Sequence, residues 1–339
     1  MNVNRTSMAL KLAGAAALLA VLMITAILLL SEPKAPVAAS IPKIDLAEPP
    51  MQQMCNTDSK IDLAEAITLQ MCKRPLASET PDNGHVFVRV PAGTYSLGEK
   101  EHRRNPRHAV KLKAFEIATT ETTNAQFARF VKATGYVTDA EKNGEAPSFH
   151  EGMMDWEWTP TKGAYWRFPF GPERPGIEDK MDHPVTQISA TDAEAYCRWA
   201  GVRLPMLDEW EAAARAGSDT LYPWGDEKMP KGKPMANFWQ GKTHAKNTME
   251  DGFLYTAPVG SFPPNKWGLY DVVGNVFEYC TSDPMPAWVH SKNACVGRGG
   301  SWWCSSGTCS FFNLVDIGQM NRKASFPNQG FRVARDAKK

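Results

Sequence analysis

The chain has 339 residues with 38 basic and 37 acidic side chains, and it is rich in glycine, proline and tryptophan. This balanced charge argues against a nucleic acid as the main partner, because neutralising phosphates requires a basic excess on some face of the protein. The aromatic content excludes a disordered chain, and the length suits one large domain or two ordinary ones.

The N-terminus carries an apolar segment. Residues 12–30 are apolar or small and uncharged, and Arg5 and Lys11 precede them. At about 1.5 Å per residue, such a helix nearly spans a hydrocarbon core of about 30 Å. We therefore assign residues 1–30 to a cytoplasmic tip and a single-pass signal anchor in the inner membrane, which places the C-terminal part in the periplasm. Cleavage after the small residues 37–39 is the alternative, and it would release a secreted or periplasmic chain.

Residues 31–85 are expected to form a proline-rich periplasmic tether. The hexapeptide Lys-Ile-Asp-Leu-Ala-Glu occurs at 43–48 and again at 60–65, and the two copies lead to Cys55 and Cys72 respectively. Because an oxidising compartment favours disulfides, we expect Cys55 and Cys72 to pair. A docking role for the repeat is the weaker alternative.

The main domain is expected over residues 86–339. Residues 86–90 indicate a strand, residues 125–134 an amphipathic helix ending at Gly135, and two more helices begin near Thr191 and after Pro205. From residue 222 onward the pattern indicates short strands and tight turns. These elements predict an α+β domain with little regular secondary structure, whose long loops need anchors such as metal ions or buried aromatic side chains.

Cys304 and Cys309 follow a Gly-Gly-Ser sequence, with four residues between them. Such a thiol pair serves as a structural disulfide, a redox couple or a clamp for a soft metal. Cys280 and Cys295 flank one strand-and-turn segment, and we expect a disulfide between them. Cys197 lies on a predicted helix face and is expected to be a buried free thiol.

An oxygen-rich set follows a tight glycine turn. Asp271, Gly274, Val276 and Glu278 lie within eight residues, and their carboxylates and carbonyls suit a hard cation such as Ca²⁺. Taken alone, these residues are more typical of caps and turns than of a metal site.

Eight segments, in order, carry a family resemblance. They are Pro184-Val185, residues 190–201, Arg203-Leu204-Pro205, residues 209–215, residues 222–226, residues 268–279, residues 298–302 and Gly330-Phe331-Arg332. Over about residues 86–336 this set resembles the formylglycine-generating enzyme (sulfatase-modifying factor) family. The resemblance implies an irregular fold related to the C-type lectin fold. The family includes oxidases that convert a sulfatase cysteine into formylglycine, sulfoxide synthases and a siderophore chromophore maturation protein, so membership alone does not decide the function.

The resemblance also implies site residues. Cys304 and Cys309 match the two cysteines that bind Cu(I) in the aerobic oxidases, and Ser301 matches a residue lining that site. Two structural calcium sites are implied as well. The first would use Asn237, Phe238, Asp251 and Phe253, and the second Asp271, Gly274, Val276 and Glu278. The histidine triad that binds iron in the sulfoxide synthases has no counterpart in the sequence.

The chain departs from the family oxidases around the thiol pair. Ser305 and Thr308 replace a histidine and a tyrosine, while Ile317 and Met320 stand where the oxidases carry an arginine and an asparagine that face the substrate. An apolar stretch containing Phe311 and Phe312 replaces an arginine-rich one. We expect this pocket to reject the polar peptide that the oxidases recognise.

These observations favour a membrane-anchored periplasmic oxidase that acts, through a Cu(I)–bis-cysteine site, on a thiol or another oxidisable group of a protein or peptide. The alternative from another class is a non-catalytic binding or maturation factor in which Cys304 and Cys309 form a disulfide. A siderophore chromophore maturation enzyme is the third possibility.

Overall fold

The computed structural model describes residues 78–79, 83–154, 157–305, 307, 309 and 311–338. These residues belong to one compact unit, Ile61–Lys339. The expected membrane segment 12–30, the tether repeat and the Cys55–Cys72 disulfide lie outside the described residues. No helix in the described part of the chain is both long enough and apolar enough to cross a membrane.

An antiparallel sheet joins the two ends of the domain. Its order is β1 (Ser78–Glu79), β2 (Val86–Val90), β5 (Phe115–Ala118) and β12 (Ala334–Asp336). Ile117 lies between Val88 and Ala334 in this sheet, and all three side chains are buried. The predicted strand 86–90 is confirmed, and β1 shows that the sheet already begins inside the segment assigned to the tether.

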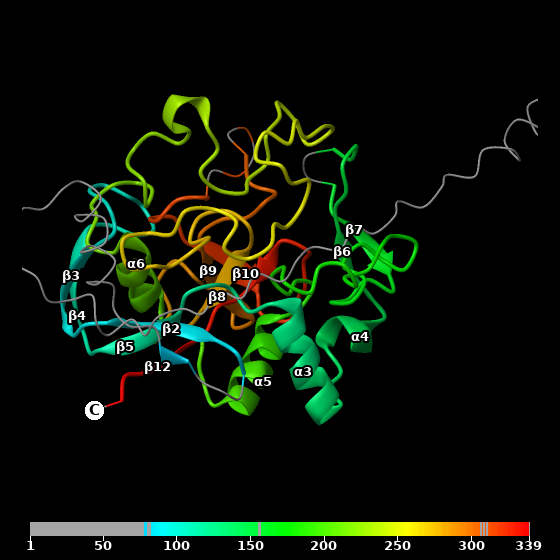
Figure 1. The fold of residues 1–339 in the computed structure, drawn as a ribbon, viewed down its shortest axis with the longest axis horizontal. Helices are drawn as coiled ribbons and strands as arrows, with labels where there is room; N and C mark the ends of the chain where they lie inside the picture. The colour runs from blue at the N-terminus through cyan, green and yellow to red at the C-terminus, as the bar shows by residue number, and fades with distance from the viewer. Residues whose placement is uncertain are drawn as a thin grey trace, which may run out of the picture. The chain divides into compact units, whose positions relative to one another are not determined.

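Two helices, α3 (Asn124–Thr134) and α5 (Ala190–Ala200), pack side by side (Figure 1). Each begins at a capping box, in which the N-cap side chain and the third helical residue bond to each other's backbone N–H. The cap of α5 is Ser189, so this helix begins slightly before the predicted start near Thr191. Each helix ends at a glycine, Gly135 or Gly201, in the left-handed conformation, as is common at helix C-termini.

A second four-stranded sheet positions the sulfur pair. Its order is β10 (Gly318–Asn321), β9 (Ala294–Arg298), β8 (Phe277–Cys280) and β11 (Gln329–Gly330), with β11 parallel to β8 and the other pairs antiparallel. Figure 1 shows β8, β9 and β10 near the middle of the domain, with long loops around them. The chain enters the loop of Cys304 directly from the end of β9.

The remaining elements are short. They are the β3 (Gly93–Leu97) and β4 (His108–Leu112) hairpin, α4 (Asp139–Asn143), the β6 (Glu145–Ser148) and β7 (Thr159–Lys162) hairpin, α6 (Leu207–Arg215) and the 3-10 turn Pro230–Gly232. Between this turn and β8 the chain has neither helix nor strand. The expectation of an irregular α+β domain is confirmed.

Buried ion pairs replace regular hydrogen bonding in this loop-rich interior. The Glu211 carboxylate on α6 accepts hydrogen bonds from Arg215 and Arg298, each at 2.8 Å, and from the backbone N–H of Gly98 at 2.7 Å. Asn105 donates a further bond of 2.8 Å. One carboxylate thereby joins α6, β9 and the loop between β3 and β4.

The expected Cys280–Cys295 disulfide is wrong. Both cysteines are buried free thiols. Cys280 on β8 lies directly opposite Val296 on β9, so its side chain shares a face with Val296 and not with the adjacent Cys295. The two thiols therefore pack into different clusters on opposite faces of the sheet. Cys197 is a buried free thiol, as predicted.

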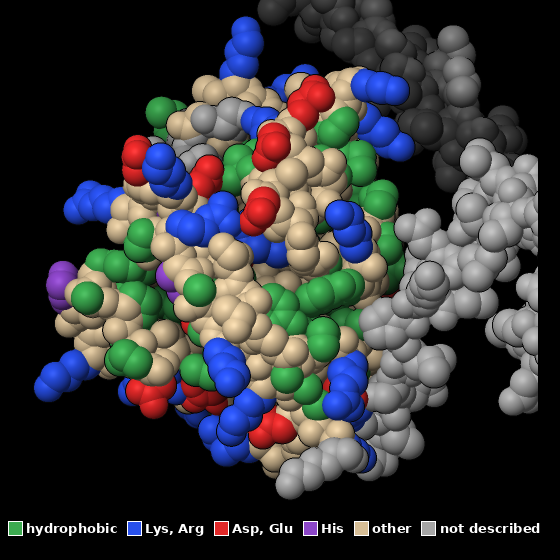
Figure 2. Space-filling model, turned by 90° about the vertical axis from the view of Figure 1, so that its left-hand side faces the viewer, with side chains coloured by type: hydrophobic (Ala, Val, Ile, Leu, Met, Phe, Trp, Pro, Cys, Tyr) green, Lys and Arg blue, Asp and Glu red, His purple; other side chains and the backbone are tan. Residues whose placement is uncertain are grey.

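Charges on the surface are mixed. On the face drawn in Figure 2, lysine and arginine side chains are interspersed with aspartate and glutamate, and hydrophobic side chains lie between them. This distribution agrees with the formal net charge of +1. Absence of nucleic-acid binding stays a prediction.

Candidate active site at the Cys304–Cys309 pair

Two glycines turn the chain from β9 toward the sulfur pair. Gly299 and Gly300 have φ values of 86° and 74°, a region that side chains disfavour. A Cβ on Gly300 would lie 2.4 Å from the Cα of Phe312. The Gly-Gly sequence is therefore required both for the turn and for the close approach of the segment that follows Cys309.

Cys304 and Cys309 are joined by a disulfide, with their Cα atoms 4.6 Å apart. Cys304 is fully buried and Cys309 is half-buried. Of the three predicted uses of the pair, this geometry is that of the disulfide. Reduced, the same two sulfurs would offer the soft thiolate ligands that Cu(I) prefers. In the described part of the chain, no three His, Cys, Asp or Glu side chains are grouped to hold a metal ion.

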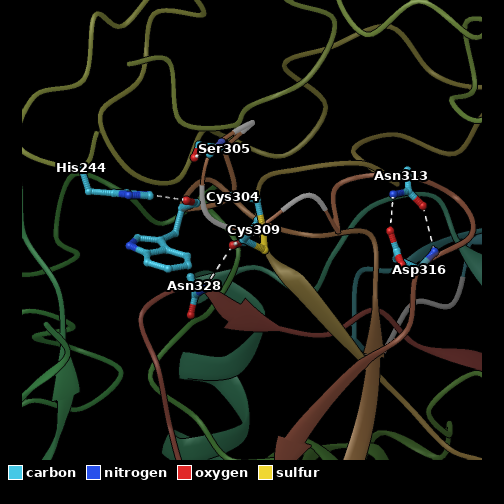
Figure 3. Close-up of a disulfide and its surroundings, with 10 residues drawn as sticks. His244, Cys304, Ser305, Cys309, Asn313, Asp316 and Asn328 are labelled. Carbon is cyan, nitrogen blue, oxygen red and sulfur yellow. Dashed lines mark hydrogen bonds between the residues drawn. A yellow bond between two sulfur atoms is a disulfide. The ribbon is translucent and has the colours of Figure 1, made fainter. Parts of the chain in front are cut away.

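Ser301 connects the sulfur pair to a neighbouring amide. Its Oγ lies 3.8 Å from the Sγ of Cys304, and it accepts a hydrogen bond of 3.1 Å from the Nδ2 of Asn328 (Figure 3). Because Asn328 donates to the Ser301 oxygen, the serine O–H is left to donate to the cysteine sulfur. Ser301 thus lies where the sequence predicted it, and Asn328 is a site residue that sequence reasoning missed.

A pocket of about 320 Å³ opens beside Cys309. Its walls come from the loop before β7, the sulfur loop, β8, β10 and the segment before β11. They consist of Trp158, Phe277, Trp303, Cys309, Phe311, Gly318, Gln319, Met320, Phe326, Asn328 and Gln329. Cys304 lies behind Cys309 and is closed to solvent.

The pocket contains only part of the predicted apolar set. Phe311 and Met320 line it, as expected for residues facing a substrate. Phe312 and Ile317, by contrast, are buried in the core cluster of the β8–β9 side and do not reach the pocket. The expectation that Ile317 and Phe312 line the pocket is wrong, because they pack against the inner residues of the domain.

His244 supports the sulfur loop from behind. Its Nε2 lies 2.6 Å from the carbonyl oxygen of Trp303, and its ring stacks on the Trp303 indole with centroids 4.4 Å apart (Figure 3). No ligand spacing marks this histidine in the sequence. Only the long-range contact between residues 244 and 303 reveals its role in holding a pocket wall.

The segment after Cys309 is held by a local turn. The side-chain oxygen of Asn313 accepts bonds of 2.8 Å from the backbone N–H groups of Val315 and Asp316, and its amide donates to the Asp316 carboxylate (Figure 3). Phe311, before this turn, lines the pocket, whereas Phe312, Leu314 and Ile317 are buried in the core.

The residues expected to form the first calcium site lie close together around Asp251. The Asp251 carboxylate accepts hydrogen bonds from the backbone N–H groups of Phe253 at 3.0 Å and Phe238 at 3.2 Å. Gln240 donates a third bond of 2.8 Å. Burial raises the pKa of Asp251. Asn237 precedes Phe238 in the chain and donates to the carbonyl of Tyr255 at 2.7 Å. The donors around Asp251 satisfy it without a cation, so calcium here stays a prediction.

The two carboxylates expected to form the second calcium site differ in their partners. Both oxygens of Glu278 are taken by Arg332, at 2.5 and 2.6 Å, and Trp210 donates to one of them. Asp271, in contrast, has a buried Oδ1 without a hydrogen-bond partner, and burial raises its pKa to about 6. The turn of Gly274 and Val276 lies between these two carboxylates in sequence.

Glu121 adds a third carboxylate to this region. It accepts a bond of 2.9 Å from Asn275, and its other oxygen is buried without a partner. Burial and the nearby charge of Asp271 raise its pKa. Unpaired buried oxygens on Asp271 and Glu121 suit a hard cation, whereas Glu278 is already neutralised by Arg332. Sequence spacing gave no indication of Glu121.

Comparisons with known proteins identify the family of this chain. The family model described as "Sulfatase-modifying factor enzyme 1-like domain" matches residues 73–337. The formylglycine-generating enzyme of Bos taurus is 40% identical over 281 residues, which cover 74% of each chain. The inactive C-alpha-formylglycine-generating enzyme 2 of the same organism is 38% identical over 236 residues, or 64% of this chain and 76% of that protein.

Among solved structures, PvdO from Pseudomonas aeruginosa superposes with a TM-score of 0.57 at 24% identity, covering 78% of this chain and 99% of PvdO. This likeness supports the fold alone. Residues 73–337, which the family model matches, include both four-stranded sheets and the sulfur pair. The chain belongs to the sulfatase-modifying factor (formylglycine-generating enzyme) family.

Proposed function

We propose that this protein is an oxidase anchored in the inner membrane, with its catalytic domain in the periplasm. It acts on a thiol, or another oxidisable group, of a protein or peptide, with dioxygen as the oxidant. The observation that carries the proposal is the position of Cys309, which lies at the wall of a pocket with Cys304 directly behind it. A purely structural disulfide has no need of such a pocket.

The chain's own residues would prepare the sulfurs for copper. Cys304 and Cys309 would hold Cu(I) after reduction, and the metal would supply oxygen activation. The O–H of Ser301, oriented by Asn328, donates toward Cys304 and stabilises its thiolate form. Trp303, Trp158 and Phe326 enclose the pocket side and restrict water there.

Copper binding tests the proposal directly. The full chain, reduced, is titrated with Cu(I) beside the variants Cys304→Ala and Cys309→Ala, with Cys197→Ala as the matched control. We expect one tight equivalent in the wild type and in the control, and none in the two site variants. Lack of binding by the reduced wild type would reject the oxidase.

Calcium is proposed as a structural cofactor, at Asp251 with Asn237, Phe238 and Phe253, and at Asp271 with Gly274, Val276 and Glu278. The unpaired buried oxygens of Asp271 and Glu121 support the second site. Such ions would stabilise loops that lack regular hydrogen bonding.

Membrane anchoring rests on the apolar segment 12–30. Fractionation of cells that produce the full chain tests it. We expect the protein in the inner-membrane fraction and, in a chain that starts at residue 31 behind a cleavable leader, in the soluble periplasmic fraction.

A non-catalytic maturation factor is the second candidate. The Cys304–Cys309 disulfide favours it, and so does the similarity to an inactive relative. In this case the pair would stay oxidised in protein purified from the periplasm and would resist mild reductants. Quantitative reduction by glutathione would contradict this second candidate.

A further inference from the structure

We infer that the pocket beside Cys309 selects substrates in which a large apolar side chain flanks the reacting thiol. Met320 and Phe311 are the residues that determine this specificity, and Asn328 receives a main-chain N–H of the same peptide. The inference rests on the proposed function, since it names the substrate class of that site.

Five aromatic side chains line the pocket, and they come from distant parts of the chain. Trp158 contacts Trp303 with ring centroids 5.3 Å apart and Phe326 with centroids 5.2 Å apart. Phe277 and Phe311 form an edge-to-face pair at 6.4 Å. An aromatic or long aliphatic side chain placed among these rings would gain burial and favourable ring contacts.

Charge is missing from the described lining of the pocket. None of its residues is Asp, Glu, Lys or Arg. A charged side chain entering it would lose water without gaining a counter-charge, which is strongly unfavourable. At about 320 Å³ the pocket is small for a ligand site, and its size suits one large side chain.

Two glycines make room for the side chains of Met320 and Phe277 in the pocket wall. Gly297 and Gly318 are paired across β9 and β10. A Cβ on Gly297 would lie 2.2 Å from the Cε of Met320, and one on Gly318 would lie 3.2 Å from the ring of Phe277. The missing side chains let Met320 and Phe277 lie close against the sheet, where they form an apolar surface.

One polar group indicates that the occupant is a peptide. The Oδ1 of Asn328 is buried and has no hydrogen-bond partner, although Asn328 lines the pocket. The neighbouring Gln329 already accepts a bond of 2.8 Å from Tyr279. A buried acceptor without a donor is costly, and a peptide N–H would satisfy it, whereas a hydrocarbon would not.

Peptide binding tests the inference without any chemistry. Capped pentapeptides carry serine in place of the reacting cysteine, flanked on both sides by Phe, Leu, Lys or Glu. Their dissociation constants for the full-length protein are measured by isothermal titration calorimetry. We expect the Phe and Leu peptides to bind at least about tenfold more tightly than the Lys and Glu peptides, from the burial of one apolar side chain. Equal affinities for all four would overturn the inference.

Variants of the pocket test which residue determines the peptide preference. Met320→Lys should lower the affinity for the Phe peptide at least about tenfold and raise the affinity for the Glu peptide. Met320→Leu should keep the wild-type order of peptide affinities, which shows that the site is intact. Gly297→Ala should lower the affinity for the Phe peptide, because the added methyl group displaces the tip of Met320. Met154→Lys, at an exposed methionine outside the pocket, is the control. Wild-type selectivity in Met320→Lys would refute the role of Met320.

Copper titration separates this inference from the proposed function. If the peptides bind selectively but the reduced protein takes up no Cu(I), the apolar specificity of the pocket is supported and the oxidase proposal is rejected. If copper binds at Cys304 and Cys309 while the peptides show no selectivity, the oxidase proposal is supported and the apolar substrate class is rejected.

Discussion

Ser301 links Cys304 to Asn328, which lines the pocket. Its hydroxyl accepts from Asn328 and faces the sulfur of Cys304. The family resemblance identified Ser301 as a site residue, but its partner Asn328 is twenty-seven positions away. The role of Asn328 depends on how β11 is placed beside β8, which no local pattern encodes.

Replacing Ser301 should weaken the metal site without unfolding it. In Ser301→Ala, the thiolate of Cys304 loses a hydrogen bond that is worth about 1.5 kcal/mol or more when the acceptor is charged. We expect about tenfold weaker Cu(I) binding in a competition assay, and the partly exposed Ser282→Ala as control should bind like the wild type. Unchanged affinity in Ser301→Ala would show that the hydroxyl does not face the thiolate.

Glu211 is a buried carboxylate that binds two buried arginines. Burial raises its pKa, but the guanidinium groups of Arg298 and Arg215 outweigh this effect and hold the pKa below its usual value. Glu211→Gln leaves two buried arginines short of a counter-charge, and we expect a loss of about 3 kcal/mol in the free energy of unfolding at pH 7. Urea unfolding measures it, with the exposed Glu173→Gln as control.

The pH dependence of this loss has a defined sign. A carboxyl whose pKa is lowered by folding contributes stability above its unfolded pKa of about 4.3 and loses it as the pH falls through the folded value. The difference between wild type and Glu211→Gln should therefore be full at pH 7 and shrink below about pH 4. A difference that stays constant down to pH 2 would exclude the ion pairs as its source.

At the scale of elements, the register of β8 against β9 decides the state of two cysteines. Burial raises the pKa of Cys295 to about 12 and raises that of Cys280 well above its ordinary value. Both thiols are therefore protonated and inert in the folded protein. Their sequence positions suggested a pair, but alternation along the strands puts them on opposite faces.

Alkylation followed by mass spectrometry checks this assignment. Without reductant, the folded protein should resist iodoacetamide at Cys197, Cys280 and Cys295, because all three are buried. After unfolding in guanidinium, still without reductant, each should take one label. A disulfide-linked peptide containing Cys280 and Cys295 would contradict the strand register.

The helices illustrate what local sequence specifies. Thr123 with Gln126, and Ser189 with Asp192, are capping boxes whose partners lie three positions apart, and each helix ends at a glycine. Such signals act within one turn, so α3 and α5 were predictable to within a residue or two, whereas the short α4 was not predicted. The sheets were not, because β12 pairs with β5 across more than two hundred positions.

At the scale of the whole molecule, long loops need anchors beyond hydrogen bonds. If calcium occupies the two proposed sites, chelation should lower the melting temperature by several degrees, since a ligand bound only to the folded state stabilises it by mass action. Differential scanning calorimetry with and without EDTA measures the shift. Asp251→Asn should remove part of it and Asp271→Asn the rest. An unchanged melting temperature would reject both sites.

The sequence by itself determined the helices α3, α5 and α6, the irregular α+β class, the thiol pair and the family resemblance, because each rests on neighbouring residues or on motifs in order. Only the tertiary structure decided which residues surround the sulfurs. Trp158, Phe277, Phe311, Met320 and Asn328 come from separate segments, and their meeting point depends on sheet register and loop packing. The same packing moved Phe312 and Ile317 into the core and kept Cys280 apart from Cys295, because a side chain's face follows from the pairing of its strand.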